Sequence, residues 1–137
     1  MRRVALIVAS LCVAVAIGGC SLGGSTTNSA GFTGVQGNVA AALNTFSSDA
    51  SSNNSKDMCT NVLDARLVKQ LGGTAACQTI ITAQLKTTDD FSLAVKAVTL
   101  SGKTATASVQ TVVAGKKKIQ SVLLHQDAAG WRVDSLL

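Results

Sequence analysis

The sequence is poor in the side chains on which several classes of function depend. Aromatic residues are few and tyrosine is absent; the chain has only Phe32, Phe46, Phe91 and Trp131. Proteins that bind single-stranded nucleic acid usually stack the bases on aromatic side chains. The sequence therefore predicts no nucleic-acid partner. With so few large side chains, alanine, valine, leucine and isoleucine must build most of the core.

Ionisable side chains are also scarce. The chain has no glutamate, seven aspartates and one histidine, His125. Of the 12 lysines and arginines, two are Arg2 and Arg3 at the extreme N-terminus. Without them, ten positive charges against seven negative ones leave a net charge of about +3. This excess is too small to indicate a nucleic-acid-binding surface.

One long hydrophobic run is present, and it lies at the N-terminus. Residues 4–18 are uncharged, follow the positive Met1-Arg2-Arg3 and end at Gly-Gly-Cys. A positive start, a short apolar run and small residues before the cleavage site are typical of a secretory signal peptide. The run is shorter than the roughly 20 apolar residues that span a bilayer. No second run follows, so the sequence does not predict a polytopic membrane protein.

Ile17-Gly18-Gly19-Cys20 resembles a bacterial lipobox, in which an aliphatic residue and two small residues precede a cysteine. The resemblance implies cleavage before Cys20, a diacylglycerol thioether on its sulfur, and N-acylation with chains such as palmitate. Two or more acyl chains hold a protein at a membrane because each buried methylene contributes about 0.8 kcal/mol. We therefore expect a lipoprotein anchored through Cys20 to the extracytoplasmic face of the cell membrane. The alternative is an ordinary signal peptide that ends near a cysteine.

The expected organisation is a signal peptide at residues 1–19, a lipidated tether at 20–31 and one domain at 32–137. The tether sequence SLGGSTTNSAG contains one leucine among small and polar residues. Such a segment buries too little apolar surface to order itself. By the scaling for Gly-rich linkers its reach is about 18 Å, which would hold the domain just off the membrane.

Two cysteines remain after Cys12 leaves with the signal peptide and Cys20 is lipidated. They are Cys59 and Cys77. An even pair outside the cytoplasm predicts a disulfide, and closing an 18-residue separation would stabilise the fold by about 3 kcal/mol. The alternatives are a metal site and a reactive thiol, but a metal site needs two further ligands and the chain has one histidine. We expect no metal and no cofactor.

Helical periodicity occupies the first half of the domain. The first predicted helix runs from Phe32 to about Ala50, with apolar residues three or four apart at Val35, Val39, Leu43, Phe46 and Ala50. A second helix is expected over residues 56–71, with Ser55 as its N-cap, and Gly72-Gly73 ends it. A third, shorter helix capped by Thr74 carries Cys77. The disulfide would then join the second helix to the third.

The spacing of apolar residues changes after Asp90 from the helical period of 3.6 to the strand period of 2. Phe91, Leu93, Val95 and Ala97 form one face of a first strand, and residues 105–113, 117–125 and 131–137 form three more. Short loops at Gly102, Gly115 and Gly130 join them, so we expect a consecutive antiparallel meander. Helices first and strands afterwards predict an α+β fold.

This order is similar to the nuclear transport factor 2-like superfamily with its cone-shaped, cystatin-like fold, and to small actinobacterial lipoproteins with such a domain. The resemblance is carried by AALNTFSSDASSNNSKDMC, the cysteines flanking VLDARLVKQLGG, the hairpin AVTLSGKTATASV and the closing GWRVDSL. It implies N-terminal helices packed on a curved four-stranded sheet. It does not imply one function, because the superfamily includes both enzymes and binding modules.

Enzymes of the superfamily place Asp, His or Tyr inside the cone. With tyrosine absent, the candidates for a pocket acid or base are Asp64 and His125. His125, at a strand end before a turn, is more typical of a solvated residue. Asp64 would either project into the cone or pair with Arg66 or Lys69 on the outer surface.

Lys116-Lys117-Lys118 is the densest charge cluster. Near a membrane these lysines would attract anionic headgroups, at about 1 kcal/mol for each charge. The favoured interpretation is an ordinary hairpin turn whose lysines also discourage strand-to-strand aggregation.

We expect a non-enzymatic binding module that recognises an envelope protein or a small apolar ligand between helices and sheet. The alternative is an isomerase- or dehydratase-like enzyme that uses Asp64 or His125. A third interpretation is a structural subunit that docks through its sheet. Two or more ionisable groups converging in the interior would favour the enzyme, whereas an apolar interior would favour binding. The oligomeric state is left open.

Overall fold

The computed structural model describes residues 31–88 and 90–136. The predicted signal peptide, Cys20 and the tether up to residue 30 lie outside the described residues. Within the described part, no helix is both long and apolar enough to cross a bilayer.

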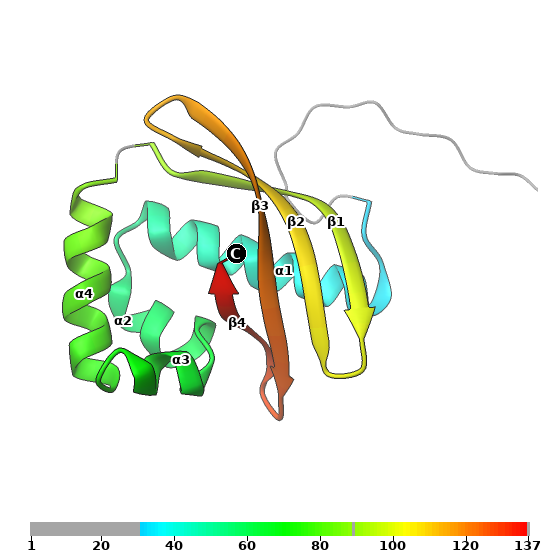
Figure 1. Cartoon of the computed structure of the whole chain (residues 1–137), viewed down its shortest axis with the longest axis horizontal. Coiled ribbons are helices and arrows are strands. Elements are labelled where there is room, and N and C mark those ends of the chain that lie inside the picture. Colours follow the sequence, from blue (N-terminus) through cyan, green and yellow to red (C-terminus); the bar gives the residue numbers. More distant parts are fainter. Residues whose placement is uncertain (1–30, 89, 137) are drawn as a thin grey trace, which may run out of the picture.

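The chain forms helices first and then a four-stranded antiparallel meander in the order β1-β2-β3-β4 (Figure 1). The sheet is curved and does not close on itself. The predicted α+β class is therefore confirmed. The elements are α1 (Gly34–Ser51), α2 (Ser55–Asp57), the π-helical turn η1 (Met58–Val62), α3 (Ala65–Gln70), α4 (Thr74–Lys86), β1 (Ser92–Ser101), β2 (Thr104–Val113), β3 (Lys116–Asp127) and β4 (Gly130–Leu136).

The core lies between α1 and one face of the sheet, here called the inner face. Val39, Leu43 and Phe46 of α1 are buried at helical spacing, as the sequence predicts, whereas Val35 is 47% exposed near the start of the helix. Alternate residues of the strands fill the other side. The buried strand residues are Leu93, Val95, Val98, Ala105, Ala107, Val109, Thr111, Val122, Leu124, Trp131 and Val133.

A β-bulge corrects the predicted inner face of β1. Leu93 and Val95 are buried as expected, but Ala97 is exposed and Val98 is buried. The register with β2 shifts between Val95 and Ala97. One extra residue in a strand reverses the alternation beyond it, and this is why the second half of β1 follows the opposite phase.

The predicted single helix over residues 56–71 is wrong. The chain forms α2 and η1, becomes extended at Leu63 (φ −81°, ψ 146°), and turns helical again at α3. Leu63 makes a parallel β-bridge with Val133, and the Asp64 N–H donates to the Val133 carbonyl at 2.7 Å. An edge strand such as β4 presents backbone groups that need partners, and this long-range pairing interrupts the local helical preference.

The helix ends also differ in detail from the expectation. Asn54, rather than Ser55, caps α2, because its side chain accepts from the Asp57 N–H. Gly72 and Gly73 end α3 as predicted, with φ of 96° and 94°, values that favour glycine. Gly73 occupies the N-cap position of α4, and Thr74, the predicted cap, is its first residue.

Cys59 of η1 and Cys77 of α4 form the predicted disulfide, with their Cα atoms 6.1 Å apart. Both cysteines are buried. Helix α4 makes its main contacts with α2, η1 and α3 rather than with the sheet. In Figure 1 it stands apart from the strands. The disulfide is therefore a covalent cross-link that holds α4 against η1.

Candidate functional site

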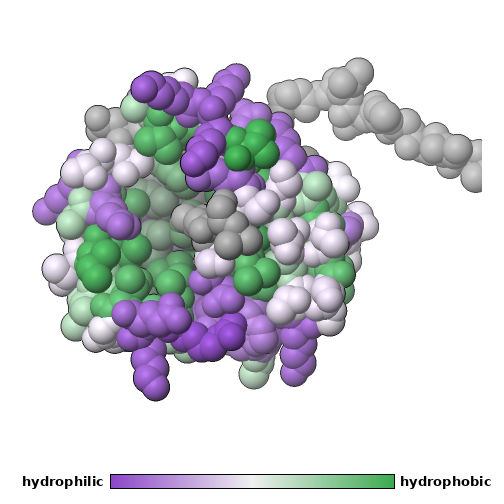
Figure 2. Space-filling model, viewed as in Figure 1, coloured by the Kyte–Doolittle hydropathy of each residue, from purple (hydrophilic) through white to green (hydrophobic). Residues whose placement is uncertain are grey.

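A pocket of about 520 Å³ lies between α4 and the sheet, here called the α4 pocket. It exists because the disulfide and the helix contacts hold α4 away from the strands. Figure 2 shows hydrophobic side chains around a hollow on this side of the molecule. Its walls include Leu67 of α3, Leu71 directly after α3, Ile81 and Leu85 of α4, and Val133 of β4.

Two phenylalanines close one side of the α4 pocket. Phe46 of α1 and Phe91, just before β1, both line it, and their rings meet edge to face with centroids 6.1 Å apart. Edge-to-face pairs stabilise beyond the area they bury. This contact ties the start of the sheet to α1 and fixes the aromatic wall.

The lining of the α4 pocket is apolar. Among the described residues that line it, none is ionisable, and the polar ones are Gln84, Thr88 and Ser135. General acid–base chemistry needs a titratable side chain within hydrogen-bonding reach of the reacting proton. The described lining supplies none, but it does supply the apolar surface and the few polar groups that are typical of small-molecule sites.

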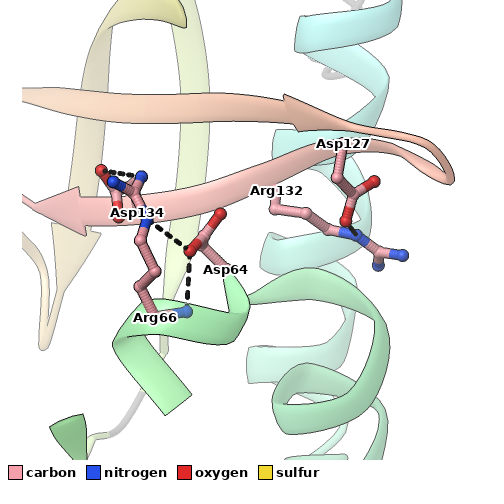
Figure 3. Close-up of polar contacts among 5 residues, drawn as sticks. All are labelled: Asp64, Arg66, Asp127, Arg132 and Asp134. Atoms are coloured by element: carbon pink, nitrogen blue, oxygen red, sulfur yellow. Dashed lines mark hydrogen bonds and ion pairs between the residues drawn. The ribbon is translucent and has the colours of Figure 1, made fainter. Parts of the chain in front are cut away.

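Asp64 has a structural position outside the α4 pocket. It is buried at the N-cap of α3, where its carboxylate accepts from the Arg66 N–H at 2.8 Å and from Arg66 Nε at 3.1 Å (Figure 3). Arg66 Nη2 also reaches Asp134 at 3.2 Å. The hydrogen bond to Asp64 and the charges of both carboxylates raise the pKa of Arg66. Asp64 therefore makes the predicted pair with Arg66 and caps a helix.

His125 does not line the α4 pocket either. It is half-buried in β3, between Thr104 of β2 and Arg132 of β4 in the register. Its neighbour Leu124 is fully buried on the inner face, so His125 lies on the opposite, outer face. Neither of the two predicted acid–base candidates lines the α4 pocket.

A more open hollow of about 450 Å³ lies beside the disulfide and includes Lys69, Asp127 and Arg132. Asp127 accepts from the N–H groups of Ala129 and Gly130. It also accepts from Arg132 Nε (Figure 3). The Ala129 N–H, more than Arg132, lowers the pKa of Asp127. A carboxyl with a lowered pKa is a weak base near neutrality. This arrangement stabilises the β3–β4 turn. The described residues contain no cluster of three potential metal ligands.

Asp49 is a buried acid that the sequence analysis did not single out. It lies on α1, is 8% exposed, and accepts from Asn54 Nδ2 at 3.2 Å through Oδ1. Its Oδ2 is buried and has no hydrogen-bond partner among the described residues. Burial, and then the neighbouring Asp57 carboxyl, raise the pKa of Asp49. The sequence contained one signal for this burial: Asp49 is three residues after the core residue Phe46, and residues three apart share a helix face.

We expect Asp49→Asn to stabilise the protein at neutral pH by about 1 kcal/mol, because an amide would remove a buried charge and donate to Asp57. A raised pKa means that the folded state holds the proton more tightly, so wild-type stability falls as pH rises above the ordinary aspartate range. The advantage of the variant should therefore shrink in acid. Denaturant unfolding at several pH values measures the difference in free energy of unfolding between the variant and wild type. Asp90→Asn, at an exposed position, is the control. A pH-independent difference would contradict this account.

No protein-family model matches the chain, and no curated protein sequence matches it. Among solved structures, the chain is similar to a crystal structure of a de novo designed protein with a curved β-sheet. The identity is 14%, the TM-score is 0.38, and the alignment covers 47% of this chain and 61% of the designed one.

Proposed function

We propose that this protein is a lipid-anchored, extracytoplasmic binding protein that holds a small apolar ligand in the α4 pocket. The observation that carries the proposal is the lining of that pocket, whose described residues are apolar apart from three uncharged polar side chains. Its volume falls within the roughly 300–1,000 Å³ of small-molecule sites.

The energetics favour a ligand that is itself apolar. Removing apolar surface from water is worth about 25 cal/mol for each Å², and no described ionisable side chain in the lining would have to be desolvated. Ile80 and Val113, both of which line the pocket, are 36% and 38% exposed. Large apolar side chains left in contact with water around a hollow are typical of a binding site.

The proposed location rests on the sequence. Ile17-Gly18-Gly19-Cys20 supplies the lipobox resemblance, and a disulfide between Cys59 and Cys77 is compatible with an oxidising compartment. The order of helices followed by a curved meander is the feature that supports membership of the nuclear transport factor 2-like superfamily. An envelope protein remains the second kind of partner in this proposal.

The enzyme alternative has less support. Asp64 caps α3, His125 lies on the outer face of the sheet, and neither lines the α4 pocket. An isomerase or dehydratase needs its acid or base beside the bound substrate. On the binding proposal, Asp64→Asn and His125→Ala leave ligand affinity unchanged, since asparagine also serves as an N-cap.

The binding proposal is tested with an uncharged fluorescent probe, N-phenyl-1-naphthylamine, titrated into the mature chain carrying Cys20→Ser to keep it in solution. We expect saturable binding to this chain, which serves as the wild-type reference. Adding Leu85→Asp should weaken the affinity for the probe by at least roughly tenfold, because a charge in an apolar site must be desolvated when the probe binds. Ile80→Asp at the partly exposed edge serves as a second variant.

The matched control is Ile119→Asp, which places the same charge on a side chain that is 62% exposed and outside the α4 pocket. Its affinity for the probe should equal that of wild type. Circular dichroism would establish that each variant is folded. Probe binding that is absent from wild type, or that survives both pocket substitutions, would contradict the proposal.

A further inference from the structure

The β2–β3 hairpin places two lysines on the same face as the α4 pocket. Val113 at the end of β2 lines the pocket, and in the strand register it lies opposite Lys116. Thr111, buried on the inner face, lies opposite Lys118. Directly opposed residues of an antiparallel pair have side chains on the same face of the sheet. Lys116 and Lys118 are therefore on the inner face, beside the edge of the pocket that Val113 forms.

The third lysine of the cluster lies on the other face. Lys117 is opposite Val112, whose neighbours Thr111 and Val113 are on the inner face. Since strand residues alternate between faces, Lys117 is on the outer face. The hairpin thus separates one contiguous run of charge into two lysines that face the pocket side and one that faces away.

The lysines of the hairpin are exposed and form no ion pair with the described residues. Other charged residues adjoin lining residues in the sequence. Lys86 follows Leu85 and the exposed Asp90 precedes Phe91. Asp64, Arg66 and Asp134 also adjoin lining residues, but they pair with one another. The two hairpin lysines therefore place positive charge, unpaired among the described residues, at the strand end that carries Val113. Figure 2 shows hydrophilic side chains along the top of the molecule, above the hydrophobic hollow.

We infer that the α4 pocket takes a single-chain amphiphile with an anionic head, whose chain fills the apolar interior and whose head binds Lys116 and Lys118. The inference rests on the proposed function and specifies its ligand. The described interior holds no cation to pair with a buried anion, and an unpaired buried charge is strongly unfavourable. The head must therefore stay at the edge, where water and the two lysines are available. A volume of about 520 Å³ suits one chain of moderate length.

The expected effect of the head is modest and depends on salt. A single exposed ion pair contributes little, so we expect two lysines acting together to raise affinity by roughly tenfold at low ionic strength. Added salt screens exposed charges and should reduce this preference without affecting the binding of an uncharged ligand.

The test is displacement of N-phenyl-1-naphthylamine by decanoate, decyl phosphate and decanol at neutral pH. The two anions are used below their micelle concentrations and decanol below its solubility limit. We expect both anions, or the one whose head fits, to bind wild type roughly tenfold more tightly than decanol. The double variant Lys116→Gln/Lys118→Gln should lose this preference and keep its decanol affinity. Lys117→Gln, which removes a charge from the same hairpin on the opposite face, should keep the preference.

Two results would overturn the inference: equal affinity of wild type for the anions and decanol, or an equal loss of preference in Lys117→Gln. If decanol displaces the probe without any preference for an anion, the head-group inference fails and the apolar pocket stands. If none of the three ligands displaces a bound probe, the head-group inference fails, and the effect of Leu85→Asp on probe binding decides the proposed function separately.

Discussion

Replacing both disulfide cysteines, in a Cys59→Ala/Cys77→Ala variant, should lower the free energy of unfolding by about 3 kcal/mol. In the chain-entropy model, a bond across 18 residues restricts the unfolded chain by that amount. The effect is large for a domain that contains four aromatic residues, because such a domain has few large side chains with which to compensate. Denaturant unfolding of the oxidised wild type and the variant measures the difference.

The same variant should also alter α4 specifically. Because α4 makes its main contacts with other helices rather than with the sheet, loss of the disulfide should increase hydrogen exchange in α4 and weaken probe binding in the α4 pocket. The matched control is Leu124→Ala, which truncates a fully buried residue of β3 outside the pocket and lowers stability by about 2–5 kcal/mol. Equal protection of the α4 amides from hydrogen exchange in the two variants would contradict the proposed role of the disulfide.

Replacing Cys20 with serine should remove the membrane anchor entirely. Wild type expressed in a lipoprotein-processing bacterial host should lose residues 1–19, gain the mass of its acyl chains and partition into a detergent phase. The Cys20→Ser variant should carry no acyl mass, because serine has no thiol to form the thioether. The expected effect is large, since each buried methylene contributes about 0.8 kcal/mol and a diacylglycerol has two long chains.

Cys12→Ser is the matched control for the anchor. It makes the same chemical change within the predicted signal peptide, which the mature protein lacks, so acylation and partitioning should equal those of wild type. Intact mass spectrometry measures the mass of the mature protein, and so the presence of acyl chains, in both variants. A wild-type mature protein without acyl mass would contradict the anchor and remove the argument for the membrane location.

The features that sequence reasoning predicted are those set by local pattern. The stripe at Val39, Leu43 and Phe46 predicted α1, and alternation with glycine-containing turns predicted a four-stranded meander. Residue type and compartment predicted the disulfide. Each of these depends on neighbours in the chain or on chemistry that one residue type carries.

The features it missed depend on contacts between distant segments. The bridge of Leu63 to Val133 interrupts a helix that local periodicity favours, and the bulge near Lys96 depends on pairing with β2. The α4 pocket arises from how far α4 stands from the sheet, which no spacing within either element specifies. For the same reason, the sequence suggested an apolar ligand between helices and sheet, and Asp64 and His125 as candidate acids or bases, but not which residues line the pocket.

The central claim is that the α4 pocket is the ligand site, and a heteronuclear NMR titration of the mature Cys20→Ser protein with decanoate tests it most directly. We expect amide shifts to concentrate at Leu67, Ile81, Leu85 and Phe91, with smaller shifts at Lys116 and Lys118. Shifts that instead concentrate on the outer face of the sheet, around Ile119 and His125, would contradict the account.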